Sequence, residues 1–514
     1  MNIWIGQRQL RRGADFAAVQ EYLSAWYLLD PRPAVRFNRR FFDTFDWRLF
    51  HLHTVLEYDA GPRCVARLRR IDDPGSSTRA AVDQVLPFAG DWNPGPLQRA
   101  LGAACAERAL LERASCELHV ARYAIVDGNG KIRGWLEHEQ VRDGRRTVAR
   151  FVRVSALRGY VKTGRRLLHR IDGFLGSSGA TDDLYLECLR RNGMKPGAYS
   201  TRLALALRPE MRSDDALAGV LLFLLDIMEL NLEGVLRDLD TEFLHDFRIA
   251  CRRSRTLLTQ VRGLFPAREL PRFKRTFAWL SRCTGVQRDL DVMLLAFPQF
   301  QHMVPGSMRS ALAPLRSLLE ERRAAAHAEL VRELRSRRFR TFLRDWRRFL
   351  QRRGPRREAG AAGERPLGET AEISLRRVAR ELAKAGKQIG SGEYSERLHD
   401  LRKTGKKLRY LLEAFRSLYS QSEVERVVRR LRKLQNTLGE IVDRHVQNGC
   451  LLAWGKELSD SGDIDETELA AIRRLAEACA RRQAVAEPKF EARFERYLEA
   501  ARSGVLRGVP TGRK

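Results

Sequence analysis

A short segment occurs twice in this chain, and the repeat constrains the fold more than any other feature of the sequence. The first copy begins at His245 and reads HDFRIACRRSR, and the second begins at His399 and reads HDLRKTGKKLR. The two histidines lie 154 residues apart, and the same offset pairs later residues without a gap as far as Asp289 and Asp443. A register kept over this length indicates that the C-terminal part of the chain is a duplicated unit.

Each copy has the periodicity of an amphipathic helix. At ~100° per residue, apolar side chains gather on one face and basic side chains on the opposite face. The basic face of each copy, here called a basic stripe, has four members: His245, Arg248, Arg252 and Arg255 in the first copy, and His399, Arg402, Lys406 and Arg409 in the second. No Glu or Asp occupies a stripe position, although a solvated helix face usually mixes acidic with basic residues. Since like charges one turn apart repel, the repeated stripe favours an anionic ligand over a merely solvated outer face.

This arrangement resembles the CHAD family, the histidine-containing α-helical domains. The resemblance rests on a His followed by Arg at +3 and by paired basic residues at +7 and +8, and on the later Gly285-x-x-x-Asp289 and Gly439-x-x-x-Asp443. It covers roughly residues 213 to the end and implies two helical bundles related by a pseudo-two-fold, whose basic helices line a shared groove that binds inorganic polyphosphate. The polyphosphate-binding residues it implies are His245, Arg248, Arg252, Arg253, Arg255, His399, Arg402, Lys403, Lys406, Lys407 and Arg409.

The overall charge also predicts a polyanionic partner. A formal net charge of +30 is typical of proteins that bind nucleic acid, polyphosphate or an anionic membrane surface. We place nucleic acid second, because Tyr410 is the only aromatic residue that interrupts the stripes and single strands usually stack on aromatic side chains. The longest apolar run, Leu217 to Leu225, is far short of the ~20 residues that span a bilayer, and the N-terminus does not resemble a signal peptide. We therefore expect no membrane association and a cytoplasmic protein, with polyphosphate granules as a candidate location; the oligomeric state stays open.

Neither metal nor cofactor is expected. The eight cysteines form no CxxC pair and no Cys/His ligand cluster, which argues against zinc and for reduced thiols. His245 and His399 either cap and pack their helices or donate to bound phosphate, since a nearby anion raises the pKa of an imidazole. Asp289 and Asp443 are predicted to bond across helices to the stripes and to orient them.

Residues 1–205 have the pattern of an α+β domain. The segment Arg39 to Leu49, RRFFDTFDWRL, resembles part of the CYTH family, the triphosphate tunnel enzymes, and implies a degenerate antiparallel β-barrel. We expect helices at 13–29, 97–114 and 155–177. The expected strands are Asn2–Gln7, Val35–Phe42, Leu52–Tyr58, Cys64–Leu68, Glu117–Val126, Ile132–Val141, Arg146–Val154 and Leu184–Leu189.

The departure from the CYTH pattern decides the expected activity. Enzymes of that family open on Glu-x-Glu-x-Lys, which binds the catalytic metal, whereas this chain opens MNIWIGQ. Glu137 and Glu139 alternate onto one strand face and Glu187 lies on another expected strand. The three residues are either the remnant of a metal site or, as we favour, surface carboxylates. We therefore predict no enzymatic activity, with a triphosphate-hydrolysing metalloenzyme as the alternative. Anion binding by this domain remains open, because Arg67, Arg69 and Arg70 lie in or just after a strand.

Residues 213–505 are predicted to be all-helical, in two halves of 213–352 and 369–505 joined by a Gly/Pro-rich linker at 353–368. Gly285 is expected to mark a helix end or a close packing contact. The expected helices are 213–237, 241–265, 270–283, 287–297, 307–351, 396–419, 422–437, 466–482 and 487–502, each half beginning with a helix that precedes its motif helix. Residues from 504 onward are expected to be disordered.

Overall fold

The computed structural model describes residues 2–10, 15–61, 64–143, 146–176, 183–352, 362–389, 395–486 and 488–502. The tail predicted to be disordered and most of the linker lie outside these residues. The chain divides into two compact units, Met1–Ser200 and Thr201–Lys514, and each unit is considered by itself.

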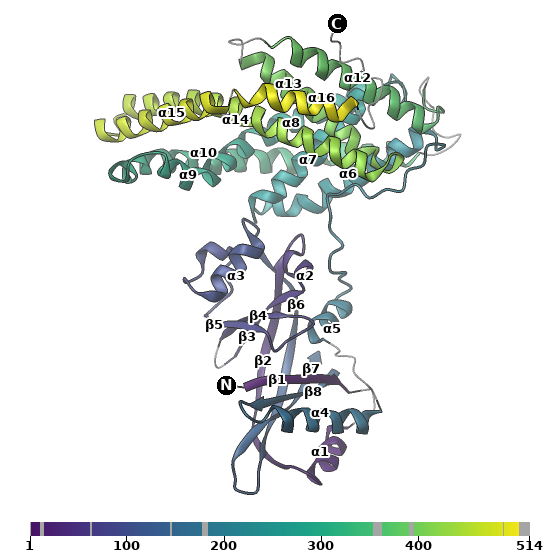
Figure 1. The fold of residues 1–514 in the computed structure, drawn as a ribbon, viewed down its shortest axis with the longest axis vertical. Helices are drawn as coiled ribbons and strands as arrows, with labels where there is room; N and C mark the ends of the chain where they lie inside the picture. Colours follow the sequence, from purple (N-terminus) through teal and green to yellow (C-terminus); the bar gives the residue numbers. More distant parts are fainter. Residues whose placement is uncertain are drawn as a thin grey trace. The chain divides into compact units, whose positions relative to one another are not determined.

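The N-terminal unit contains one eight-stranded antiparallel sheet (Figure 1). Its strand order is β1-β8-β7-β6-β2-β3-β4-β5. Seven expected strands are confirmed, most of them longer than predicted, and β5 was missed. The strands are β1 (Asn2–Gln9), β2 (Leu28–Thr44), β3 (Thr54–Ala60), β4 (Val65–Arg70), β5 (Ser77–Ala81), β6 (Leu110–Val126), β7 (Ile132–Asp143) and β8 (Arg146–Leu157).

The sheet corrects the expectation of a barrel. Strands β1 and β5 stand at the two ends of the order, and the described residues show no pairing between them. The sheet is therefore open. Strand count and alternation cannot decide closure, which requires strand tilt and stagger to match around the whole ring.

In the described part of this unit, five α-helices accompany the sheet: α1 (Phe16–Ser24), α2 (Arg48–His51), α3 (Pro96–Cys105), α4 (Val161–Leu175) and α5 (Leu184–Arg191). The strand predicted at Leu184–Leu189 is wrong, because this segment forms α5. Asp183 caps the helix by accepting from the Tyr185 backbone N–H at 2.8 Å, and the buried positions Leu184, Tyr185, Cys188 and Leu189 follow a helical spacing. A short apolar run has the same appearance in a strand and in a buried helix, so periodicity alone could not separate the two.

The C-terminal unit is all-helical, as predicted (Figure 1). Its first half contains α6 (Ser213–Leu236), the motif helix α7 (Thr241–Gln260), α8 (Leu270–Leu295), α9 (Phe297–His302), α10 (Ala313–Arg335) and α11 (Arg337–Gln351). Its second half contains α12 (Leu367–Lys387), the motif helix α13 (Ser395–Ala414), α14 (Gln421–Asp460), α15 (Glu466–Ala486) and α16 (Lys489–Arg502).

The glycines of the two signatures lie inside helices. Helix α8 continues through Gly285 and the 40-residue helix α14 continues through Gly439, so the expected helix ends at these positions are wrong. The alternative, a close packing contact, holds. A Cβ atom at Gly439 would lie 3.7 Å from a guanidinium nitrogen of Arg402, and one at Gly285 would lie 3.7 Å from Arg248. Both glycines therefore pack beside an arginine of the basic stripe, at a distance that an alanine Cβ atom would also tolerate.

The two halves share a core at their far ends. Beyond the signature glycines, α8 and α14 extend with α9, α10 and α15 as long helical arms that lie side by side (Figure 1). Buried residues from both arms form one hydrophobic cluster, which includes Phe297, Phe300, Leu315, Leu451 and Ile472. Burial of such side chains stabilises by roughly 1.5–3 kcal/mol each, so this cluster ties the halves together. In the part of the chain that is described, no helix is long and apolar enough to cross a membrane.

Candidate anion-binding groove between the motif helices

The two motif helices pack against each other and leave a groove of about 620 Å³. Asp240 caps α7 by accepting from the backbone N–H groups of Glu242 and Phe243 at 2.9 and 3.2 Å, which sets where this helix begins. The apolar faces of both helices point into the bundles, so their basic faces meet at the groove. Its walls are Arg252, Arg255, Thr256, Thr259 and Gln260 of α7, and His399, Arg402, Lys403, Lys406, Lys407 and Tyr410 of α13.

Six of these wall residues are arginine or lysine, and no carboxylate is among the wall residues. Within the described residues, Arg252, Arg255, Lys406 and Lys407 form no ion pair. Exposed like charges that lie one turn apart are destabilising. The groove therefore concentrates positive charge that the protein itself leaves largely unbalanced.

Seven of the eleven predicted binding residues line the groove, and four do not. The four that lie elsewhere are His245, Arg248, Arg253 and Arg409. The prediction also missed four uncharged wall residues. Three of them stand one turn after a stripe residue, as Thr256 does after Arg252, Thr259 after Arg255 and Tyr410 after Lys406. Extending the stripes by one helical turn finds these three, whereas no comparable signal marks Gln260.

Arg253 is bound within the protein. Its guanidinium donates to Glu413 of α13 at 2.9 Å and to the Thr201 carbonyl at 2.8 Å. Glu413 also pairs with Arg409 at 3.7 Å, one turn earlier on its own helix. Arg253 therefore joins α7 to α13 through Glu413. The same carboxylate pairs with Arg409, the last residue of the second stripe.

Two further arginines of the stripes are oriented from the neighbouring helices. Arg402 donates to Asp443 at 3.0 Å, which confirms the predicted cross-helix bond. In the first half Arg248 donates to the Thr284 hydroxyl at 2.8 Å. The corresponding bond predicted for Asp289 is not found among the described residues, where Asp289 interacts with Arg248 through its charge. Burial raises the pKa of this carboxyl despite the nearby guanidinium.

Burial, together with neighbouring positive charges, lowers the pKa of Lys406 and of both motif histidines. Burial and the charges of Arg252 and Arg402 lower the pKa of Lys406 to about 7. The pKa values of both histidines are lowered as well, for His245 by burial and Arg288 and for His399 by burial and Lys403. The raised imidazole pKa expected from the sequence refers to an anion-bound groove, which would reverse these shifts.

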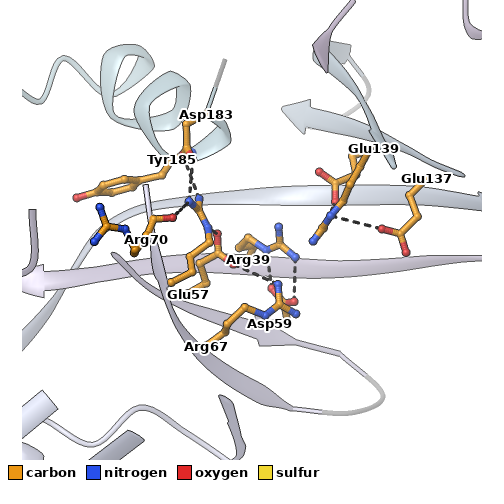
Figure 2. Close-up of polar contacts among 11 residues, drawn as sticks. Arg39, Glu57, Asp59, Arg67, Arg70, Glu137, Glu139, Asp183 and Tyr185 are labelled. Carbon is orange, nitrogen blue, oxygen red and sulfur yellow. Dashed lines mark hydrogen bonds and ion pairs between the residues drawn. The ribbon is translucent and has the colours of Figure 1, made fainter. Parts of the chain in front are cut away.

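In the N-terminal unit, the arginines considered as anion ligands are already paired (Figure 2). Arg69 donates to Glu57 at 2.5 Å and to Asp183 at 2.7 Å. Arg67 pairs with Glu57 at 3.4 Å. Although burial opposes ionisation, Arg69 and Arg39 hold the pKa of Glu57 well below its usual range. This carboxylate is therefore charged and surrounded by guanidinium groups.

The carboxylates considered as a remnant metal site are likewise paired. Glu139 is buried, not on the surface as expected, and accepts from Arg153 at 2.7 Å. Arg153 also lies 3.6 Å from Glu137. Glu187 lies on α5 and pairs with Arg190 and Arg191 of the same helix, both at 2.8 Å. Among the described residues, no group of three or more His, Cys, Asp and Glu side chains could hold a metal ion.

The helices that form the groove lie in a segment whose sequence matches a known protein family. The sequence model of the CHAD domain family matches residues 219–452. A crystal structure of the CHAD domain from the plant Ricinus communis is 22% identical, with a TM-score of 0.48 over 58% of this chain and 96% of that chain. PptA from Streptomyces chartreusis is 17% identical, with a TM-score of 0.42 over 55% of this chain and 100% of that chain. No curated protein matches the sequence. The matched residues span α7, α13 and the groove between them, and residues 219–452 of this chain form a CHAD domain.

Proposed function

We propose that this protein binds inorganic polyphosphate in the groove between α7 and α13. The observation that carries the proposal is the convergence of six Arg and Lys side chains from both copies of the motif, without a carboxylate, on one groove of about 620 Å³. Arginine matches phosphate oxygens with a planar fork, and lysine adds a compact point charge. A chain of closely spaced phosphates would offset the repulsion within the groove.

The uncharged wall residues favour the same ligand. Thr256, Thr259 and Gln260 line the groove beside the cations. The Thr259 hydroxyl donates to the Arg255 carbonyl at 2.9 Å, so the Thr256 hydroxyl and the Gln260 amide are the groups that can bond to phosphate oxygens. Tyr410 is the one aromatic side chain on the walls. Successive bases of a nucleic acid would need several stacking surfaces, so the wall suits a ligand of phosphate alone better than a single strand.

We further infer a targeting or scaffold role in the cytoplasm, with polyphosphate granules as the site of action, and no enzymatic activity. The inference about activity rests on the sequence departing from Glu-x-Glu-x-Lys at its opening and on the pairing of Glu57 and Glu139 with arginine. The guanidinium groups bound to both carboxylates oppose the approach of a divalent cation.

Competition between two polyanions tests the proposal. Fluorescently labelled long-chain polyphosphate bound to the protein should be displaced by unlabelled polyphosphate at lower charge concentration than by duplex DNA. Affinity should fall as salt rises, because counterion release drives much of the binding to any linear polyanion. Equal or stronger displacement by DNA at physiological salt would move the function to nucleic-acid binding.

A further inference from the structure

A second basic pocket lies in the same unit, between α14 and α16. It has a volume of about 170 Å³ and is lined by Arg430 and Lys433 of α14 and by Arg493 and Arg496 of α16. Each helix contributes two cations three residues apart, which places them on one helix face. None of the four residues lines the groove between the motif helices.

These cations have no acidic partner in the part of the chain that is described. The one hydrogen bond of their side chains that is found there runs from Arg493 to the Lys433 backbone carbonyl at 3.4 Å. Many other arginines of this unit pair with carboxylates, as Arg323 does with Asp238 and Asp291. Four facing cations repel one another unless an anion lies between them.

Helix packing holds the pocket in shape. Phe490, Phe494 and Tyr497 are buried on the other side of α16. The Phe494 ring lies directly against Gly386 of α12, where there is no space for a Cβ atom. These anchors fix α16 along the bundle, so Arg493 and Arg496 are presented to α14 from a rigid helix.

The pocket belongs to one half only. The 154-residue register places Thr276 and Trp279 of α8 at the positions of Arg430 and Lys433. Trp279 is buried beneath Arg338, whose guanidinium lies 4.1 Å from the ring centre. The equivalent surface of the first half is therefore filled by an aromatic side chain, and α16 itself lies beyond the residues that match the CHAD family.

We propose that Arg430, Lys433, Arg493 and Arg496 form a second oxyanion site, which takes one or two phosphoryl groups. The pocket has a volume of about 170 Å³, compared with about 620 Å³ for the groove, which suits a small anion such as inorganic phosphate or pyrophosphate. Forked guanidinium groups from α16 and an ammonium group from α14 supply bidentate and single charge-assisted bonds. The phosphoryl groups come either from a small free anion or from a polyphosphate chain.

Pyrophosphate titration in a protein with a disabled groove tests this site. The background protein carries Arg252→Gln, Arg402→Gln and Lys406→Gln, so that binding in the groove is weakened. It should still bind one pyrophosphate by calorimetry. Adding Arg493→Gln and Arg496→Gln should weaken that binding by about tenfold or more, the effect of losing 1.4 kcal/mol. The matched control, Arg337→Gln with Arg340→Gln, removes two exposed arginines with the same spacing from α11 and should leave binding unchanged.

The outcomes separate this site from the proposed groove. Unchanged pyrophosphate binding after the α16 substitutions, or no pyrophosphate binding by the background protein, would overturn the second site. Failure of the wild-type protein to bind long-chain polyphosphate would overturn the groove and leave the second site standing. The α16 substitutions, made in an otherwise wild-type protein, show where the bound phosphoryl groups come from. A loss of long-chain affinity shows that the site binds part of a polyphosphate chain. A loss confined to pyrophosphate shows that the site binds a small free anion. Circular dichroism checks that each variant is folded.

Discussion

At the scale of single residues, the pKa of Lys406 should depend on whether the groove holds an anion. Burial and neighbouring arginines lower its pKa to about 7, and a bound anion favours the protonated ammonium group and raises that pKa. Polyphosphate affinity should therefore be highest below pH 7 and decline as the pH rises above 7 toward the bound-state pKa. At about pH 8, binding should take up protons, since the free amine becomes charged in the complex.

Calorimetry in two buffers of different ionisation enthalpy measures this proton uptake. Lys406→Arg is the control, because a guanidinium stays charged throughout this pH range. The variant should bind with similar affinity at pH 7 and take up fewer protons at pH 8. The same uptake in both proteins would show that another group is responsible.

Substitution of Asp443 should raise the affinity for polyphosphate. Its carboxylate holds Arg402 at 3.0 Å and is half exposed, so Asp443→Asn removes a negative charge that competes with the ligand. Exposed ion pairs contribute roughly 0.2–1 kcal/mol, which corresponds to a gain in polyphosphate affinity of about 1.4- to 5-fold. Equilibrium titration at low salt measures the gain, and a loss of affinity would show that Arg402 needs this partner to be placed for binding.

Single residues also show where the sequence was informative. Arg252 and Arg253 are adjacent, and the sequence predicted both as ligands. A helix turns about 100° per residue, so Arg252 faces the groove whereas Arg253 meets Glu413, which lies 160 residues away. Helical periodicity identified five of the wall residues, and the CHAD resemblance added Lys403 and Lys407. Periodicity could not identify pairing that depends on how distant helices pack.

At the scale of elements, the glycines of the helical unit make a matched pair for mutation. Gly439→Ala and Gly386→Ala both place a better helix former inside a helix. A Cβ atom at Gly439 meets Asp443 at 3.4 Å, an ordinary contact, whereas at Gly386 it would overlap the Phe494 ring. Gly439→Ala should stabilise the unit by about 0.4–1 kcal/mol, and Gly386→Ala should destabilise it by about 1–3 kcal/mol.

Urea denaturation followed by circular dichroism measures both changes. Equal effects of the two substitutions would contradict the packing of α16 on α12. The structure also explains why helix ends were wrongly predicted near Gly285 and Gly439. Glycine often follows a helix, and only the packing of Arg248 and Arg402 against these positions shows that both glycines lie inside helices.

At the scale of the whole molecule, the charges of the two units are organised differently. In the N-terminal unit, buried arginines and carboxylates pair with each other across the sheet, as Arg39 does with Asp59 at 2.6 Å. In the helical unit, cations collect in a groove without acidic wall residues. Both units are rich in arginine, so composition could not distinguish them, and the CYTH resemblance of the first unit stays a prediction.

This difference predicts that the protein does not hydrolyse triphosphates. Incubation of tripolyphosphate or a nucleoside triphosphate with Mg²⁺ or Mn²⁺ should release no phosphate above the rate in buffer. Glu57 and Glu139 are surrounded by guanidinium groups, which would repel a divalent cation. Metal-dependent phosphate release that disappears in Glu139→Gln would show that the sheet retains a catalytic site.

The central claim, that both copies of the motif serve one groove, is tested most directly by titrating long-chain polyphosphate against single-stripe variants. One variant carries Arg252→Gln and Arg255→Gln, the other Arg402→Gln and Lys406→Gln, and Arg337→Gln with Arg340→Gln is again the control. Each single-stripe variant should lose affinity by about tenfold or more. The slope of log affinity against log salt should shrink by about 1.4–1.8 units, since two cations at ~0.7–0.9 each are removed. The control should bind as the wild type does. Wild-type affinity in either single-stripe variant would contradict the account, because one copy of the motif would then have no part in binding.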